Sequence, residues 1–374
     1  MSVYDYAKTD TTPEKAGYHE KRLQVLSDHY KALVDNGRIQ AASFLMARGG
    51  KIFAHQVIGK LTQLENSPAI KTDSIKRVAS ISKLFTATAI MKLIEDGKLW
   101  LKQSVSEIIA DFDTPYHNPI TLWHLLTHTS GLPADPGYFC EPSPIGWSEV
   151  FDKEDWIGAI LQGPLQNKPG ENWNYCSRGY AILGEIVSRV SGQHFNDYVQ
   201  KEIFIPLKMN RSFFEVPESL ENEVCTRTDE ERKDIDVSRE RISGRAPRSG
   251  GGAYCSLYDL YRFGQCFLNG GTLDNIRILG RMTVEAMTTN QLENVPAFHW
   301  GTNCKSYRHG LGWGFFCDGS TVSPECVNHE GFGWSSLYAD PRENFIFASF
   351  VADNNVWDPD VQVIPRTIAF SGIT

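Results

Sequence analysis

Ser80 and Lys83 have the types and the spacing that could make a serine nucleophile. They stand three positions apart at the start of a long apolar segment, and residues with that separation are neighbours on a helix surface. A serine hydroxyl attacks well only when a nearby base takes its proton, and the amine of Lys83 would be within reach. N–H groups of the first helical turn would stabilise an oxyanion at Ser80. A Ser-x-x-Lys sequence also arises by chance, so the pair alone does not establish an active site.

Two further motifs carry residues that can take part in catalysis. Tyr175 and Ser177 lie two positions apart, and His329 stands two positions before Gly331, which Phe332 follows. A phenol, a hydroxyl and an imidazole can each move a proton or bind a reacting carbonyl compound. Three motifs in a fixed order favour an active site far more than one motif does.

The ordered set of Ser-x-x-Lys, Tyr-x-Ser and His-x-Gly resembles the serine β-lactamase and penicillin-binding-protein superfamily. Within it, the branch holding class C β-lactamases, D-alanyl carboxypeptidases and family VIII carboxylesterases is the most similar. Class A enzymes pair Ser-x-x-Lys with Ser-Asp-Asn and Lys-Thr-Gly. This chain has Tyr-x-Ser in place of Ser-Asp-Asn and His-x-Gly in place of Lys-Thr-Gly. The segments 123–132, 169–170, 250–256 and 310–314 add to the likeness, which spans nearly the whole chain.

The resemblance implies roles for the first three residues. Ser80 would be the acylated nucleophile, Lys83 its proton acceptor or relay, and Tyr175 a second acid and base beside both. Lys83 can accept a proton only if burial and nearby positive dipoles bring its pKa well below the free value of about 10.4. Either Lys83 or Tyr175 could be the base in acylation, and we expect the two to titrate as a coupled pair.

The resemblance also implies a set of binding residues. Ser177 would hydrogen-bond the substrate amide or the lysine amine, at a position where the family usually has Asn. His329 replaces a lysine that in many relatives binds a substrate carboxylate, and imidazole is mostly uncharged at neutral pH. The oxyanion would be bound by the backbone N–H groups of Ser80 and of Phe332, which follows Gly331.

These motifs lead us to interpret the chain as a serine hydrolase that forms an acyl-Ser80 intermediate on a small-molecule ester or amide, with an ester as first choice. D-alanyl carboxypeptidase or β-lactamase activity ranks second. The motifs Tyr-x-Ser and His-x-Gly depart from the pattern that binds a substrate carboxylate, and without a visible export signal the enzyme is expected to be separated from peptidoglycan. An acyltransferase would use the same acyl-enzyme with another acceptor. A penicillin-recognising scaffold without turnover is a further alternative. No cofactor is expected.

The composition is that of an ordinary globular protein. Of the 374 residues, 41% are hydrophobic and 22% are charged, and no apolar run approaches the roughly 18 residues of a membrane span. The net charge of −8 without a basic stripe excludes the footprint of a nucleic-acid-binding protein. The N-terminal residues are charged where a secretion signal is apolar, so we expect a cytoplasmic protein without nucleic-acid or membrane partners. The oligomeric state is left open.

Other reactive side chains are expected to have structural roles. The eight cysteines lack the paired spacing of a zinc site, and free thiols are expected, with Cys176 as a packing residue. His124 and His128 lie four positions apart on a predicted helix, but they lack further ligands, so we expect packing or capping and no metal. Aromatic residues that could wall an acyl pocket, or simply pack, are Tyr138, Phe139, Trp147, Phe151 and Trp156 in one loop region and Phe298, Trp300 and Tyr307 in another.

The helices that must hold these residues follow from apolar periodicity. A helix is predicted from about 13 to 36, and a second one over 80–96 is apolar around most of its surface, which indicates burial in the middle of the molecule. Helical patterns broken by Pro and Gly dominate residues 101–207.

The strands are predicted at the two ends of the chain. The runs 43–48 and 51–58 are joined by two glycines, and 333–339 and 344–351 are joined by a short polar turn, so each pair predicts a hairpin. A further strand is predicted over 309–316.

Together these elements predict an α+β fold, with one antiparallel β-sheet built from both chain ends, flanked by helices, and an inserted, mostly helical lobe. We expect residues 1–84 and 300–374 to form the sheet lobe and 85–299 the helical lobe. The active site is expected in the cleft between them.

Overall fold

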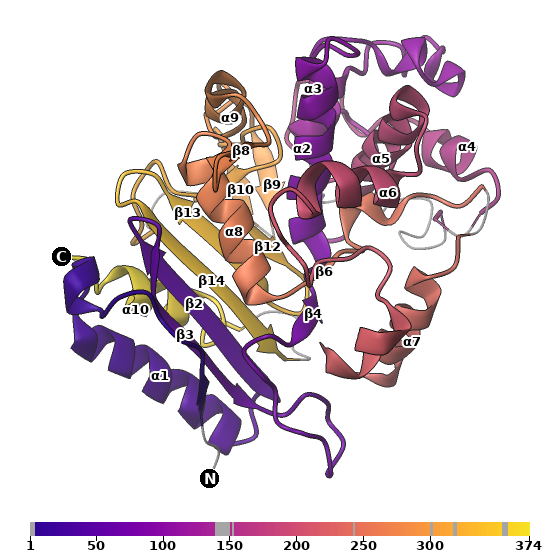
Figure 1. Cartoon of the computed structure of the whole chain (residues 1–374). Helices are drawn as coiled ribbons and strands as arrows, with labels where there is room; N and C mark the ends of the chain where they lie inside the picture. The colour runs from indigo at the N-terminus through magenta and orange to yellow at the C-terminus, as the bar shows by residue number, and fades with distance from the viewer. Residues whose placement is uncertain are drawn as a thin grey trace.

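The largest sheet of the computed structural model joins the two ends of the chain (Figure 1). The structure describes residues 4–138, 150–151, 153–241, 244–299, 302–316, 320–353 and 358–374. The strand order is β1-β3-β2-β14-β13-β12-β11, and every pair is antiparallel. Its strands are β1 (Asp5–Tyr6), β2 (Ala41–Arg48), β3 (Lys51–Gly59), β11 (Gly314–Phe315), β12 (Val327–Gly331), β13 (Ser335–Asp340) and β14 (Phe345–Ala352). The predicted α+β fold is confirmed.

Both predicted hairpins are present, and local sequence explains them. β2 and β3 are joined through Gly49 and Gly50, whose φ angles of 59° and 75° suit a two-residue turn that needs positive φ at both positions. β13 and β14 pair antiparallel across the turn that precedes Phe345. The predicted strand over 309–316 is wrong in length, because only β11 is extended there and His309 makes an isolated bridge to Gly314.

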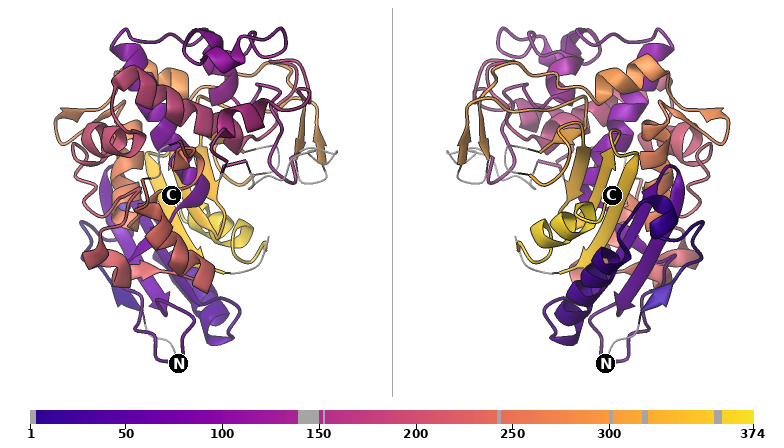
Figure 2. Two further views of the ribbon diagram at one scale, coloured as in Figure 1. Left: turned by 90° about the vertical axis from the view of Figure 1, so that its right-hand side faces the viewer. Right: turned by 90° about the vertical axis from the view of Figure 1, so that its left-hand side faces the viewer.

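Helices cover both faces of the sheet (Figure 2). On one face α1 (Glu20–Asp35) packs against α10 (Val363–Phe370), so helices from opposite ends of the chain lie together. On the other face α8 (Leu257–Leu268) contacts β2, β13 and β14. Alternate residues of β2 enter the two separate apolar clusters, which is the period-2 pattern of a sheet buried on both faces.

The middle of the chain forms the helical part of the molecule around α2. The remaining helices are α2 (Ser82–Glu95), α3 (Leu122–Leu126), α4 (Trp156–Leu161), α5 (Ser177–Ser191), α6 (Phe195–Val199), α7 (Asp229–Ser238) and α9 (Arg281–Met287). The remaining strands are β4 (Ile75–Arg77), β5 (Val224–Cys225), β6 (Tyr254–Cys255), β7 (Thr272–Leu273), β8 (Ile276–Arg277), β9 (Ala297–His299) and β10 (Thr302–Cys304). The main apolar cluster runs from the sheet through α2, α5 and α8. The lobe boundaries at 84 and 300 stay a prediction.

α2 is buried on nearly every side, as its sequence predicts. Its buried residues occur throughout the helix, from Ser82 to Leu93. A short 3-10 helix, η2 (Ala79–Ile81), precedes it and connects it to β4. Among the residues that the structure describes, no helix is long and apolar enough to cross a membrane.

Candidate active site

Ser80 lies in η2, one residue before the N-cap of α2 rather than in its first α-helical turn. Ala79, just before it, has a φ of 45°, a left-handed conformation that non-glycine residues seldom adopt. Ser82 holds the bend, because its hydroxyl donates to the Ala79 carbonyl at 2.6 Å and accepts from the Ala253 N–H at 2.9 Å. Strained backbone of this kind is concentrated at functional sites.

The amine of Lys83 reaches the three groups nearest to Ser80. Its side chain is fully buried, and Nζ lies 3.2 Å from Oγ of Ser80, 3.0 Å from Oγ of Ser177 and 2.7 Å from the carbonyl oxygen of Gly250. The i,i+3 spacing places the first contact, as expected from sequence. The other two contacts come from α5 and from the turn before β6.

Burial lowers the pKa of Lys83 to about 8, although the nearby Asp135 carboxylate and Cys176 oppose the shift. The lowered pKa meets the requirement for a lysine that accepts a proton from Ser80 near neutral pH. The titratable groups that face this amine are Asp135, Tyr175, Cys176, Tyr180, His128 and His329.

Tyr175 lies against both Ser80 and Lys83. Its side chain hydrogen-bonds Ser80, and the Lys83 amine is 4.7 Å from the centre of its ring. Burial raises the pKa of Tyr175 well above its usual value, with smaller contributions from Tyr138 and Asp135. The phenol is therefore protonated at neutral pH and can donate a hydrogen bond.

Ser177 begins α5 and is bound by a carboxylate that the sequence did not single out. Its hydroxyl donates to Oδ2 of Asp135 at 2.6 Å, and its N–H donates to Oδ1 at 2.8 Å. The N–H of Asp135 donates in turn to the carbonyl of Tyr175 at 2.8 Å. An Asp in a Pro- and Gly-rich loop looks like an ordinary turn residue, so the local sequence carried no signal for this contact.

The end of β12 brings His329, Gly331 and Phe332 to the same site. Gly331 lies so close to η2 that a Cβ atom there would come within 2.1 Å of the carbonyl oxygen of Val78. Two side-chain bonds hold the turn that follows, Ser335 Oγ to Val78 O at 2.8 Å and Lys76 Nζ to Gly333 O at 2.6 Å. Phe332 in this turn is 62% exposed.

His329 is a buried neutral imidazole. Burial, with a smaller contribution from the charge of Lys83, lowers its pKa to about 3, while its bond to the Glu330 carbonyl opposes the change. Nδ1 lies 2.9 Å from that carbonyl oxygen, and the ring centre lies 6.4 Å from that of Tyr175. The position therefore carries no positive charge at neutral pH.

Aromatic rings surround the site on the helical side. The ring centre of Tyr175 lies 4.5 Å from that of His128 and 4.7 Å from that of Tyr138, and Trp173 stacks on Tyr307 at 4.0 Å. Trp156, in contrast, belongs to the main core. Phe139, Trp147 and Trp300 lie outside the described residues.

The competing reactive residues have structural roles. His124 caps α3, where its Nδ1 accepts from the Thr121 N–H at 3.0 Å, and Nδ1 of His128 accepts from the Cys176 N–H at 3.0 Å. Burial raises the pKa of Cys176 to about 12, so its thiol is a packing group as predicted. The described cysteines, Cys176, Cys225, Cys255, Cys266, Cys304 and Cys326, are free, and Cys140 and Cys317 lie outside the described residues.

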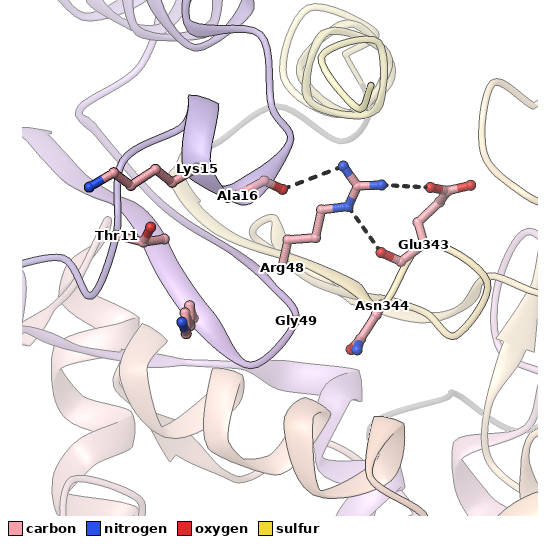
Figure 3. Close-up of a pocket in the computed structure, with 8 residues that line it drawn as sticks. Thr11, Lys15, Ala16, Arg48, Gly49, Glu343 and Asn344 are labelled. Atoms are coloured by element: carbon pink, nitrogen blue, oxygen red, sulfur yellow. Dashed lines mark hydrogen bonds and ion pairs between the residues drawn. The ribbon is translucent and has the colours of Figure 1, made fainter.

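A cavity of about 440 Å³ lies at the turns β2–β3 and β13–β14, away from this site (Figure 3). Arg48 crosses it, donating to the carbonyls of Ala16 at 3.4 Å and Glu343 at 3.2 Å and to the Glu343 carboxylate at 3.1 Å. The Ser80 site lies at the other end of β13, where Ser335 contacts Val78. Arg48 thus ties the N-terminal segment to the sheet.

Comparison with known proteins identifies the family. The family model described as Beta-lactamase matches residues 26–369. The chain belongs to the Beta-lactamase family. This Beta-lactamase family chain is 34% identical over 172 residues to Penicillin-binding protein 4* of Bacillus subtilis (strain 168), a match covering 45% of this chain and 36% of that protein. The chain therefore spans little more than a third of that relative's length.

Solved structures show the same fold for the whole Beta-lactamase family chain. A penicillin-binding protein homologue from Caulobacter crescentus has a TM-score of 0.74 at 18% identity, covering 98% of this chain and 99% of that one. A family VIII carboxylesterase also has a TM-score of 0.74 at 18% identity, covering 98% of this chain and 100% of that one. The resemblance inferred from the motifs is confirmed.

Proposed function

We propose that this chain is a serine hydrolase that is acylated on Ser80 and prefers small-molecule esters as substrates. The observation that carries the proposal is the buried Lys83 amine, 3.2 Å from the Ser80 hydroxyl and with a pKa lowered to about 8. Such an amine can take the serine proton near neutral pH. Membership of the Beta-lactamase family supports the same chemistry.

The reaction has two acyl-transfer steps. Ser80 gives its proton to Lys83 Nζ while Oγ bonds to the substrate carbonyl carbon, and the carbonyl π electrons move onto the oxygen, which the N–H groups of Ser80 and Phe332 would bind. The intermediate then expels the alkoxide, which takes the Tyr175 phenol proton, and the lysine ammonium reprotonates the phenolate. Water then attacks the acyl carbonyl carbon and gives a proton to Lys83 Nζ. As Ser80 Oγ leaves, it takes the Tyr175 phenol proton, and the lysine ammonium reprotonates the phenolate.

The surroundings of the nucleophile favour an ester without a carboxylate. The neutral imidazole of His329 supplies no positive charge to bind a substrate anion. The Ser177 hydroxyl already donates to Asp135, so it is not available to donate to a substrate amide carbonyl. Both observations weaken recognition of a D-alanyl peptide or a β-lactam and leave simple esters as the preferred class.

A substrate panel with the Ser80→Ala variant tests this proposal. We expect turnover of p-nitrophenyl acetate and butyrate, slower turnover of D-alanyl amides and nitrocefin, and loss of all of it in Ser80→Ala with an unchanged circular dichroism spectrum. Faster hydrolysis of nitrocefin than of the esters would reverse the substrate order. Full ester hydrolysis by Ser80→Ala would refute the assignment of the nucleophile.

A further inference from the structure

Asp135 clamps the Tyr175-x-Ser177 motif at both of its ends. Its backbone N–H binds the Tyr175 carbonyl, one carboxylate oxygen accepts the Ser177 N–H, and the other accepts the Ser177 hydroxyl. Its side chain is largely buried, with the residue 8% exposed. Both oxygens of this buried carboxylate accept hydrogen bonds from one serine. Because charge-assisted hydrogen bonds are stronger than neutral ones, they hold the carboxylate in a fixed orientation.

The bond from Ser177 to Asp135 fixes which way protons are shared around Lys83. A hydroxyl has a single proton, so Ser177, having donated it to the carboxylate, can only accept from the amine. The Gly250 carbonyl can also only accept. In its neutral form Lys83 has two N–H groups and one lone pair, and these two neighbours take both N–H groups. The lone pair is left for Ser80, the one contact with a proton to give.

We propose that Asp135 is a positioning residue that, acting through the hydroxyl of Ser177, turns the Lys83 lone pair toward Ser80. The inference rests on the proposed function, because it assigns Asp135 a part in activating the nucleophile. In acylation the proton passes from Ser80 Oγ to Lys83 Nζ as Oγ bonds to the carbonyl carbon. Asp135 and Ser177 neither gain nor lose a proton.

Asp135→Asn is a sharp test because it reverses one bond and preserves another. The amide oxygen can still accept the Ser177 N–H, while the amide NH₂ would face the Ser177 hydroxyl and donate to it. The hydroxyl proton is then free to occupy the Lys83 lone pair in place of the Ser80 proton. The variant also removes a negative charge that faces the amine.

The measurement is kcat/KM for p-nitrophenyl butyrate from pH 5.5 to 9.5. It is made on the unaltered chain and on the variants Asp135→Asn, Ser177→Ala and the double variant. We expect the high-pH plateau to fall at least about tenfold in both single variants, with little further loss in the double variant. The midpoint of the acidic limb should fall by about one pH unit in Asp135→Asn. Loss of folded protein would lower the plateau without moving this midpoint, whereas loss of the Asp135 charge alone would move the midpoint without lowering the plateau.

Three results would overturn the inference. They are an Asp135→Asn variant with the plateau and the midpoint of the unaltered chain, losses that multiply in the double variant, and a Ser177→Ala variant with full kcat/KM. The last result needs no Asp135 variant, so it decides the question even if Asp135→Asn does not fold. A chain that neither hydrolyses the ester nor reacts with a fluorophosphonate probe at Ser80 would instead contradict the proposed function.

Discussion

The charge on Lys83 controls the chemistry proposed for Ser80. The amine is buried among an aromatic ring, two hydroxyls and a carbonyl, and burial is the largest cause of its lowered pKa. With a pKa of about 8, roughly one lysine in ten is neutral at pH 7, compared with fewer than one in a thousand for a free lysine. The fold thus makes a base available without removing the lysine from its three hydrogen-bond partners.

This charge state predicts a pH profile. Because only the neutral amine can accept the Ser80 proton, kcat/KM should rise about tenfold per pH unit below about pH 7 and level off above about pH 8. The profile is measured with p-nitrophenyl butyrate after subtraction of the rate given by Ser80→Ala. A flat profile between pH 6 and 9 would show that Lys83 is not the titrating base.

At this scale, sequence predicts contacts that are local and misses those that depend on the fold. Ser80 and Lys83 could be paired because three residues along a helix set their separation. The Asp135 contact joins residues that are 42 positions apart, and the Gly250 contact uses a backbone carbonyl, which no side-chain pattern reveals. The neutrality of His329 followed from residue type, and its burial became visible only in the structure.

The end of β12 is the structural element that carries the predicted oxyanion N–H group. β12 packs against η2, and Gly331 fits there only because it lacks a side chain. The bonds from Ser335 and Lys76 fix the turn beyond it. The position of the Phe332 N–H relative to Ser80 therefore depends on this close backbone contact and on the two side-chain hydrogen bonds.

Gly331→Ala should separate this strand end from Ser80. The new methyl group would meet the Val78 carbonyl at 2.1 Å, so β12 or η2 must shift, and we expect kcat/KM to fall at least about tenfold. Gly251→Ala is the control, since a Cβ atom there would meet nothing nearer than the Ala79 carbonyl carbon at 3.9 Å. Equal activity in both variants would contradict the role given to β12.

Sequence predicted the elements with strong, regular patterns. The glycine pair at 49–50 and the strand-like runs beside it were sufficient to predict the first hairpin. The short 3-10 helix before α2 was not predicted, because the apolar pattern continues through it while tertiary bonds from Ser82 set its backbone. The glycine-rich segment before β11 has strand-like residues but little strand pairing.

Over the whole molecule, separate parts of the chain bring uncharged histidines into one buried region. His128 follows α3, His309 precedes β11 and His329 lies in β12, and the rings of His128 and His309 are 5.2 Å apart. Among the described residues, neither ring nitrogen of His309 has a hydrogen-bond partner. Burial lowers the pKa of His309 and of His329 to about 3 and that of His128 well below its usual value.

These histidines predict acid sensitivity of the fold. The unfolded chain takes up protons near pH 6.5 while the folded histidines do not, so stability falls as pH drops from about 6.5 toward 3, by about 1.4 kcal/mol per pH unit for each. Urea unfolding at pH 6, 5 and 4.5 measures this slope. His309→Gln, which does not titrate, should reduce the slope by one histidine's share, and an unchanged slope would show that His309 is protonated in the folded chain.

The proposed chemistry depends on acylation of Ser80, which requires that the buried Lys83 amine take its proton. Its most direct test is mass spectrometry of the chain quenched in acid within the first turnover of p-nitrophenyl butyrate, followed by peptide mapping. We predict one butyryl group on Ser80 in the unaltered chain and at least about a hundredfold slower labelling in Lys83→Met. Label on another residue, or labelling of Lys83→Met at the unaltered rate, would contradict the claim.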